Sequence, residues 1–118
     1  MFNVMGFATV RISSKNISQS KEWYRGLFGA DPIEDLVDFV SFQIAGVCLD
    51  VCLADAKSPV GGSVGYWLVD ELDSVIARAV QLGGEIYRGP LRVDETQRTI
   101  VQIMGPCGTV VGFEAGTP

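Results

Sequence analysis

The chain has 118 residues, of which 47% are hydrophobic and 19% are charged, and this composition excludes a disordered or fibrous protein. A chain of this length forms one domain, or two half-domains that share a core. Nine basic against 14 acidic residues give a net charge of −5, and histidine is absent, which excludes Ser-His-Asp triads and His-ligated zinc sites.

The first half of the chain predicts a strand, a helix and further strands. Residues 7–13 alternate apolar and polar side chains, which indicates a half-buried strand. Ser18 is a favoured helix N-cap, and apolar residues follow it at helical spacing until Gly29, a residue type that ends helices. After a loop or strand edge, residues 38–44 and 47–54 are typical of two strands joined by a short turn.

The second half predicts the same order of elements. Residues 57–63 are rich in Gly, Pro and Ser and predict a linker. Residues 64–69 then predict a strand, and Asp70 or Asp73 can cap a helix that ends at Gly83-Gly84. The remaining strands are expected at 85–88, 98–104 and 109–114.

An offset of 55 positions relates the two halves. It aligns Thr9 with Val64, Ser18 with Asp73, Leu27 with Leu82, and Gly29 with Gly84. A repeat of this length indicates a duplicated unit that cannot cover its own apolar face alone. We therefore predict a single α+β domain of two tandem βαβββ modules, residues 5–56 and 64–116. Their curved mixed sheets would surround a concave groove, with the helices on the convex side.

Strand alternation predicts which side chains face the groove. The residues expected under the helices are Ala8, Val10, Ile12, Leu49, Val51, Leu53, Gly65, Trp67, Val69, Val111 and Phe113. The residues expected to line the groove are Thr9, Arg11, Cys48, Asp50, Cys52, Val64, Tyr66, Leu68, Gly112 and Glu114.

The chain contains three cysteines, an odd number. Cys48 and Cys52 would lie roughly 13 Å apart on one strand face, too far for a disulfide. We interpret these two and Cys107 as small buried hydrophobes, and a redox or metal role is the alternative.

Four patterns resemble the vicinal oxygen chelate superfamily, which comprises glyoxalases, bleomycin resistance proteins and extradiol dioxygenases. They are NISQSKEWYRGLFGADP at 16–32, YWLVDELDSVIARAVQLGGEI at 66–86, GP at 89–90 and GPCGTVVGFE at 105–114. Together they cover nearly the whole chain, and the resemblance implies the two-module fold with its groove.

The resemblance also implies where a divalent metal would bind in members that work by metal catalysis. The four ligand positions fall on Thr9, Asp50, Val64 and Gly112. One carboxylate alone does not hold such an ion against water. Glu114 could join Asp50 on Mg²⁺ or Mn²⁺, but we favour an ion pair between Arg11 and one of the two carboxylates. We therefore expect no metal, no cofactor and no catalytic residue.

The leading hypothesis is a metal-free binding protein that resembles the bleomycin-resistance branch and holds a drug-sized ligand in the groove of a homodimer. The net charge of −5 would attract a cationic drug or antibiotic. The ligand-binding residues would be Thr9, Arg11, Asp50, Val64, Tyr66, Leu68, Gly112 and Glu114.

Two alternatives remain open at this point. One is an enzyme, a glyoxalase-like lyase or isomerase or a dioxygenase-like protein, that uses groove carboxylates with or without a divalent metal. The other is a member kept for protein interaction, with its groove filled by its own side chains.

Nucleic acids and membranes are not expected as partners. Binding to phosphates requires clustered Lys and Arg, and the basic residues of this chain are scattered. No apolar stretch reaches the roughly 18 residues that span a bilayer. Residues 1–10 lack the basic segment and cleavage pattern of a secretory signal, so we expect a cytoplasmic protein.

Overall fold

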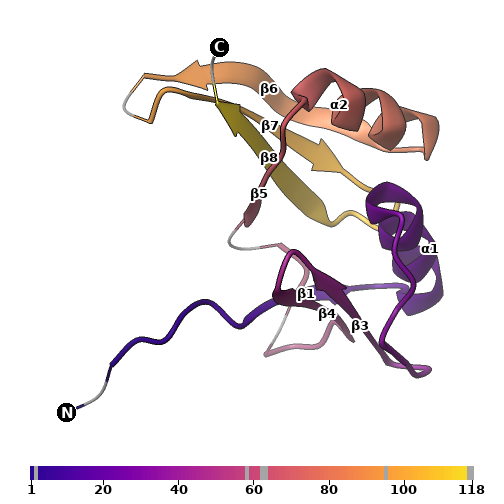
Figure 1. Ribbon diagram of the computed structural model, residues 1–118. Coiled ribbons are helices and arrows are strands. Elements are labelled where there is room, and N and C mark those ends of the chain that lie inside the picture. The colour runs from indigo at the N-terminus through magenta and orange to yellow at the C-terminus, as the bar shows by residue number, and fades with distance from the viewer. Residues whose placement is uncertain (2, 58, 62–63, 95, 117–118) are drawn as a thin grey trace.

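The first half of the chain forms a mixed sheet with one helix, and the second half repeats this arrangement (Figure 1). The computed structural model describes residues 1, 3–57, 59–61, 64–94 and 96–116. The first module consists of β1 (Thr9–Ser14), α1 (Ile17–Phe28), β2 (Glu34–Asp35), β3 (Phe39–Ile44) and β4 (Val47–Leu53). The second consists of β5 (Tyr66–Leu68), α2 (Leu72–Gln81), β6 (Glu85–Val93), β7 (Arg98–Met104) and β8 (Val110–Gly116).

Both sheets have the same topology. The strand orders are β1-β4-β3-β2 and β5-β8-β7-β6, with the first strand of each module parallel to the last and the other pairs antiparallel. The predicted α+β fold of two tandem βαβββ modules is confirmed. As a result, β1 and β5 each form a free edge of their own sheet.

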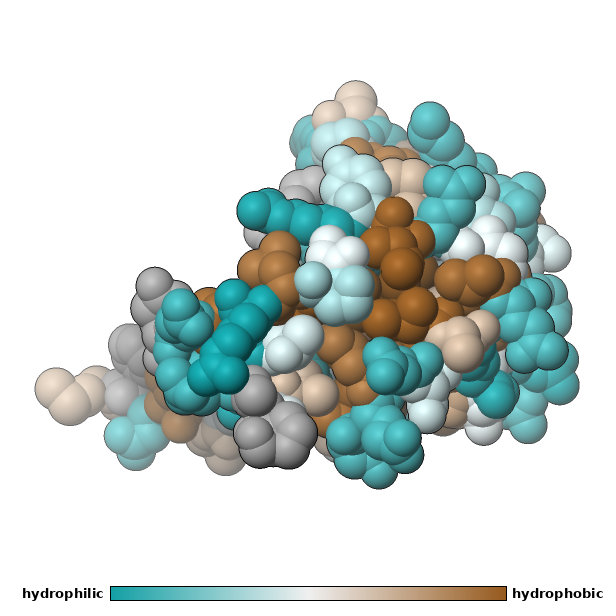
Figure 2. Space-filling model, turned by 90° about the horizontal axis from the view of Figure 1, so that it is seen from above, coloured by the Kyte–Doolittle hydropathy of each residue, from teal (hydrophilic) through white to brown (hydrophobic). Residues whose placement is uncertain are grey.

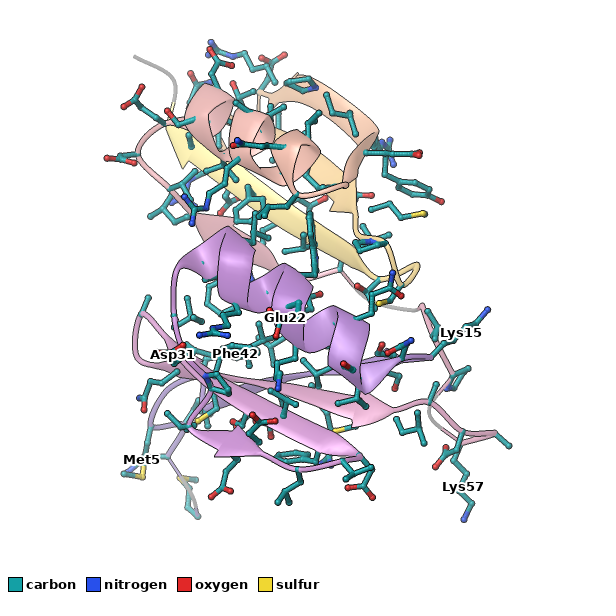
Figure 3. All side chains as sticks on the ribbon, turned by 90° about the vertical axis from the view of Figure 1, so that its right-hand side faces the viewer. Met5, Lys15, Glu22, Asp31, Phe42 and Lys57 are labelled. Carbon is teal, nitrogen blue, oxygen red and sulfur yellow. The ribbon has the colours of Figure 1, made fainter. Side chains whose placement is uncertain are left out.

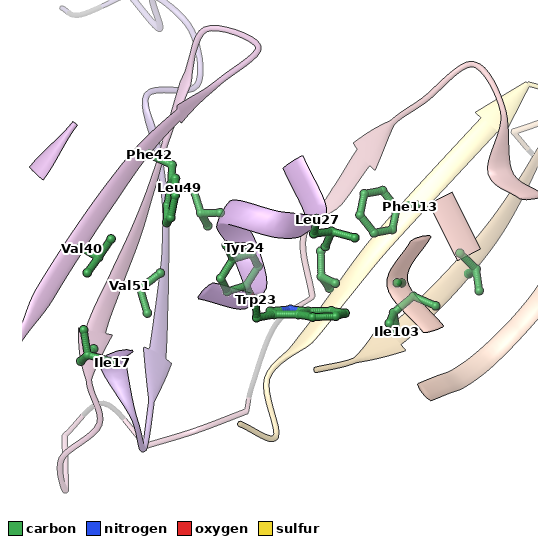
Figure 4. Close-up of a cluster of buried hydrophobic side chains, with 13 residues drawn as sticks. Ile17, Trp23, Tyr24, Leu27, Val40, Phe42, Leu49, Val51, Ile103 and Phe113 are labelled. Atoms are coloured by element: carbon green, nitrogen blue, oxygen red, sulfur yellow. The ribbon is translucent and has the colours of Figure 1, made fainter. Parts of the chain in front are cut away.

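One apolar core runs through both modules (Figure 4). Strand alternation places one set of side chains from each sheet in this core, as predicted. The strand residues of this core are Val40, Phe42, Leu49, Val51, Val101, Ile103, Val111 and Phe113. Three predictions were wrong, because Ala8 and Gly65 are exposed and Leu53 is 52% exposed at the end of its strand.

Helix α1 holds the two sheets together. Figure 4 shows Trp23 and Tyr24 between the side chains of the first sheet and those of the second. The ring of Tyr24 lies 6.5 Å from that of Phe42 in the first sheet. The ring of Phe28 lies 5.4 Å from Trp67 and 6.1 Å from Phe113 in the second. Side chains of one helix therefore fix how the modules sit against each other.

The start of α1 differs from the prediction. The N-cap is Asn16, whose side-chain oxygen accepts a hydrogen bond from the Gln19 backbone N–H at 2.9 Å, and Ser18 lies inside the first turn. An Asn three residues before a free helical N–H caps as well as a Ser does. The predicted end is confirmed, since Gly29 adopts the left-handed conformation with φ of 64°.

Two other boundaries also differ. Neither Asp70 nor Asp73 caps α2, because Glu71 occupies the N-cap without a side-chain hydrogen bond and Asp73 lies in the first turn. The strand expected at 85–88 continues to Val93. The longer strand β6 stays paired with β7 over its length, with register shifts between Ile86 and Leu91.

Residues 3–8 extend away from the rest of the molecule ahead of β1 (Figure 1). Figure 3 shows Met5 on this N-terminal arm, standing apart from the body, whereas Phe42 lies between the strands and α1. Part of the predicted linker, at positions 58, 62 and 63, lies outside the described residues. Within the described part of the chain, no helix has the length and apolar character needed to cross a bilayer.

Candidate ligand groove

A cavity of about 520 Å³ opens where the two free edges, β1 and β5, approach each other. We call it the seam cavity. One wall consists of Phe7, Thr9, Val10, Arg11 and Ile12, and the other of Val64, Gly65, Tyr66 and Trp67. Its remaining lining comes from Tyr24, Val47, Leu49, Val110 and Val111. The cavity is thus mostly apolar and aromatic, with a few polar groups from the two edge strands.

The strand registers place Arg11 and Tyr66 at equivalent points of the two modules. Arg11 stands opposite Asp50 in the first sheet, and Tyr66 stands opposite Gly112 in the second. The numbers 11 and 66 differ by the offset found in the sequence repeat. At equivalent positions the first module therefore presents two charged residues, and the second presents a tyrosine opposite a glycine.

The ring of Tyr66 lies directly over Gly112. A Cβ atom added at position 112 would come within 2.6 Å of Tyr66 Cδ2 and 2.9 Å of the Gly65 carbonyl oxygen, so only glycine fits there. The phenol oxygen of Tyr66 accepts a hydrogen bond from Gln102 Nε2 at 2.7 Å. Gly112 and Gln102 together hold the ring flat against β8.

The two groove carboxylates are bound by neighbours other than Arg11. Asp50 is half-buried and accepts a hydrogen bond from the Ser41 hydroxyl at 2.7 Å. Glu114 forms an ion pair with Arg98. The predicted ion pair with Arg11 was therefore wrong. Among the described residues, Arg11 forms no ion pair, and its Nε donates a hydrogen bond to Cys52 Sγ at 3.0 Å.

Four of the predicted ligand-binding residues line the seam cavity, namely Thr9, Arg11, Val64 and Tyr66. The other four, Asp50, Leu68, Gly112 and Glu114, are absent from its lining. Gly112 is buried under Tyr66, and Leu68 is 65% exposed beyond the end of the cavity wall. The sequence pattern placed all eight on one face, but the cavity lies between the two sheet edges, and only some residues of that face reach it.

The sequence reasoning missed residues that border the cavity from outside the predicted face. Phe7 reaches it from the N-terminal arm, and Val47 and Val110 reach it from the first residues of their strands. Six residues that were expected only under the helices also line the cavity, because it opens between two sheet edges: Val10, Ile12, Leu49, Gly65, Trp67 and Val111. The one sequence signal that could have placed Phe7 at the cavity is its position as an apolar residue just before the edge strand β1.

Tyr24 lines the cavity from α1 and is buried there. Burial raises the pKa of its phenol from 10.0 to about 12, although the hydrogen bond that it donates to Thr109 Oγ1 at 3.3 Å acts in the opposite direction. This phenol therefore stays protonated near neutral pH and acts as a neutral polar group.

The three cysteines are free thiols. Cys107 is buried, as predicted, and its thiol lies 3.2 Å from Gln19 Oε1. Cys48 and Cys52 are only half-buried, on the groove face of β4. The expectation that all three are buried therefore holds for one of them.

Residues 6–113 match the family model of the Glyoxalase/Bleomycin resistance protein/Dioxygenase superfamily. The chain belongs to this superfamily. The resemblance seen in the sequence motifs is thereby confirmed, and the match spans both modules and both walls of the seam cavity. A search of curated proteins found no relative.

Solved structures share the superfamily fold at low sequence identity. A lactoylglutathione lyase from Agrobacterium tumefaciens matches with a TM-score of 0.78 at 19% identity, covering 96% of this chain and 95% of its own. A glyoxalase/bleomycin resistance protein from Catenulispora acidiphila matches with 0.72 at 20%, covering 96% and 100%. A fosfomycin resistance protein from Listeria monocytogenes, complexed with Mn(II) and sulfate, matches with 0.78 at 18%, covering 98% and 93%. At these identities the likeness shows the fold alone.

The residues at the superfamily's metal-ligand positions do not fit a catalytic divalent ion. Of Thr9, Asp50, Val64 and Gly112, only Asp50 provides a carboxylate, and the Tyr66 ring covers the Gly112 position. Within the described part of the chain, no three Cys, Asp or Glu side chains come close enough to hold a metal. Such sites need several oxygen or nitrogen ligands, and these four positions provide one carboxylate.

Proposed function

We propose that this chain is a metal-independent small-molecule binding protein of the bleomycin-resistance type, with its ligand in the seam cavity of a homodimer. The observation that carries the proposal is the Tyr66 ring on Gly112. It puts a flat aromatic surface where a metal ligand would otherwise project.

The size and lining of the seam cavity support ligand binding. Small-molecule sites measure about 300–1,000 Å³ and combine apolar walls with a few placed polar groups. The seam cavity has about 520 Å³, apolar walls, and polar groups at Thr9, Arg11 and Tyr66. An open cavity of this size also argues against a groove filled by its own side chains.

The enzyme alternative finds less support in the geometry. A catalytic acid or base must reach the reacting atoms with a free proton-accepting or proton-donating group. Glu114 is paired with Arg98, Asp50 is bonded to Ser41, and neither borders the seam cavity.

Two exposed apolar surfaces support the homodimer. On the N-terminal arm, Val4 and Met5 are 83% and 96% exposed. Figure 2 shows a second apolar patch in the middle of the face seen from above. On α2 and β6, Val80 and Ile86 are 52% and 45% exposed. A two-fold partner is the commonest way in which soluble proteins cover such surfaces.

A thermal-shift screen tests the binding function. Small aromatic acids, amines and neutral antibiotics are each added with and without EDTA. We expect at least one compound to raise Tm equally in both conditions. A ligand at 100 times its Kd adds about 2.7 kcal/mol to the free energy of unfolding. Tyr66→Ala should weaken that ligand's binding, whereas Tyr66→Phe, which keeps the ring, should preserve most of it. A shift that EDTA abolishes and Mn²⁺ restores would overturn the proposal.

A further inference from the structure

Arg11 is the charged residue of the seam cavity. Among the described residues that line it, no other side chain carries a charge near neutral pH. The other residues that line the cavity are one Thr, two Tyr, one Trp, one Gly and aliphatic or Phe side chains. The cavity is therefore locally positive in a chain whose net charge is −5.

No carboxylate neutralises Arg11 in the described part of the chain. Among the described residues, its guanidinium donates one hydrogen bond, to the thiol of Cys52, a weak acceptor. Asp50 stands directly opposite in the strand register, yet its carboxylate is bonded to Ser41 and forms no ion pair with Arg11. Arg98 provides the contrast, because it occupies the same concave side and is paired with Glu114.

Two other openings also meet at Arg11. One is lined by Ser13, Tyr87 and Thr109 among others and has no acidic group among its lining residues. The other includes Asp38 and Asp55 on its lining and runs along the first sheet, away from β5. An anion is therefore favoured on the seam side of Arg11 and disfavoured on the side of these two aspartates.

We propose that the ligand is a small organic anion with an aromatic or apolar body. Its carboxylate or similar oxyanion binds Arg11, because a guanidinium matches two oxygen acceptors at once. Its body packs against Tyr66, Trp67 and Val64 on the opposite wall. This inference rests on the proposed function and replaces the cationic ligand expected from net charge alone.

The test compares three probes that share one aromatic body: 1-naphthoate, 1-naphthamide and 1-naphthylmethylammonium. Isothermal titration calorimetry measures each Kd for the wild type and for Arg11→Gln, Arg11→Lys and Lys15→Gln. Lys15→Gln is the matched control, since it removes one exposed positive charge just after β1. Melting curves verify that each variant is folded.

We expect naphthoate to bind the wild type about tenfold or more tightly than naphthamide, and the ammonium probe to bind most weakly. Arg11→Gln should remove the preference for naphthoate over naphthamide, Arg11→Lys should keep part of it, and Lys15→Gln should keep all of it. Equal or tighter binding of the amide or ammonium probe would overturn the anionic ligand and leave the binding function standing. If none of the probes binds at millimolar concentration, the seam cavity is not the ligand site and both proposals fail.

Discussion

Gly112 and Tyr66 show at the level of single residues how this groove departs from a metal site. A side chain at position 112 would project toward the concave face, but the Tyr66 ring occupies that space. The hydrogen bond from Gln102 fixes the phenol end of the ring. One glycine thus permits an aromatic wall that no larger residue would allow.

Replacing Gly112 with Ala should therefore destabilise the protein by about 1–3 kcal/mol, the usual cost of overpacking. Urea unfolding measures the change. Gly116→Ala is the control, since nothing lies within 4 Å of a Cβ at that position of the same strand. In a Tyr66→Ala background the cost should shrink, because the ring is then gone. An equal cost in both backgrounds would contradict the contact.

Because of Tyr24, the free energy of unfolding should depend on pH in the alkaline range. The pKa of its phenol is raised to about 12 in the folded state by burial, above the 10.0 expected in the unfolded state. The stability linked to this proton is complete below pH 10 and is lost as pH rises toward 12. Between pH 10 and pH 12 the free energy of unfolding should fall by about 2–3 kcal/mol more for the wild type than for Tyr24→Phe. Parallel losses in urea titrations of the two proteins would contradict this account.

At the level of elements, α1 joins the two modules. Its buried face packs on β3 and β4, while Phe28 contacts Trp67 and Phe113 of the second sheet. Because β1 and β5 do not pair with each other, the seam cavity depends on this helix for its width. Damage to α1 should therefore loosen the cavity as well as the core.

The variant Phe28→Ala tests this role. It removes both aromatic contacts with the second sheet. We expect the free energy of unfolding to fall by about 2–4 kcal/mol, somewhat less than for the same substitution of a fully buried Phe. Leu36→Ala, at a side chain that is 58% exposed, should change stability by less than about 0.5 kcal/mol. Urea unfolding followed by Trp fluorescence measures both. A similar small change in the two variants would show that α1 does not hold the modules together.

The elements were predictable from the sequence, but the way in which the sheets meet was not. The repeat and strand alternation predicted both modules and placed Arg11 and Tyr66 at equivalent positions, because such signals are local. The seam cavity depends on contacts of Phe28 with residues far along the chain. The partner of Glu114 was missed because Arg98 lies on β7, diagonal to Glu114 in a register that only the fold defines.

For the whole molecule, the net charge of −5 does not give the sign of the charge inside the groove. Acidic residues such as Asp31, Glu34 and Asp38 lie at exposed positions. In contrast, Arg11 is the one charged side chain among the described residues that line the seam cavity. Total charge governs solubility and long-range attraction, whereas a binding site responds to the groups that line it.

The proposed homodimer gives a prediction for the whole molecule. Light scattering after size-exclusion chromatography should give twice the chain mass of 12.7 kDa. Met5→Asp should shift the mass toward the monomer if the arm lies in the interface, because a charge would then be buried. Asn3→Asp adds the same charge to an exposed polar position of the arm and should leave the dimer intact. A monomeric wild type at micromolar concentration would contradict the dimer.

Metal content tests the central claim of a metal-independent groove most directly. The protein is purified without chelator, dialysed against buffer with Mg²⁺, Mn²⁺ or Zn²⁺, freed of excess ion and measured by inductively coupled plasma mass spectrometry. With one carboxylate among the four superfamily ligand positions, we expect far less than one ion per chain for each metal. One tightly held ion per chain that is lost in Asp50→Asn would contradict the account.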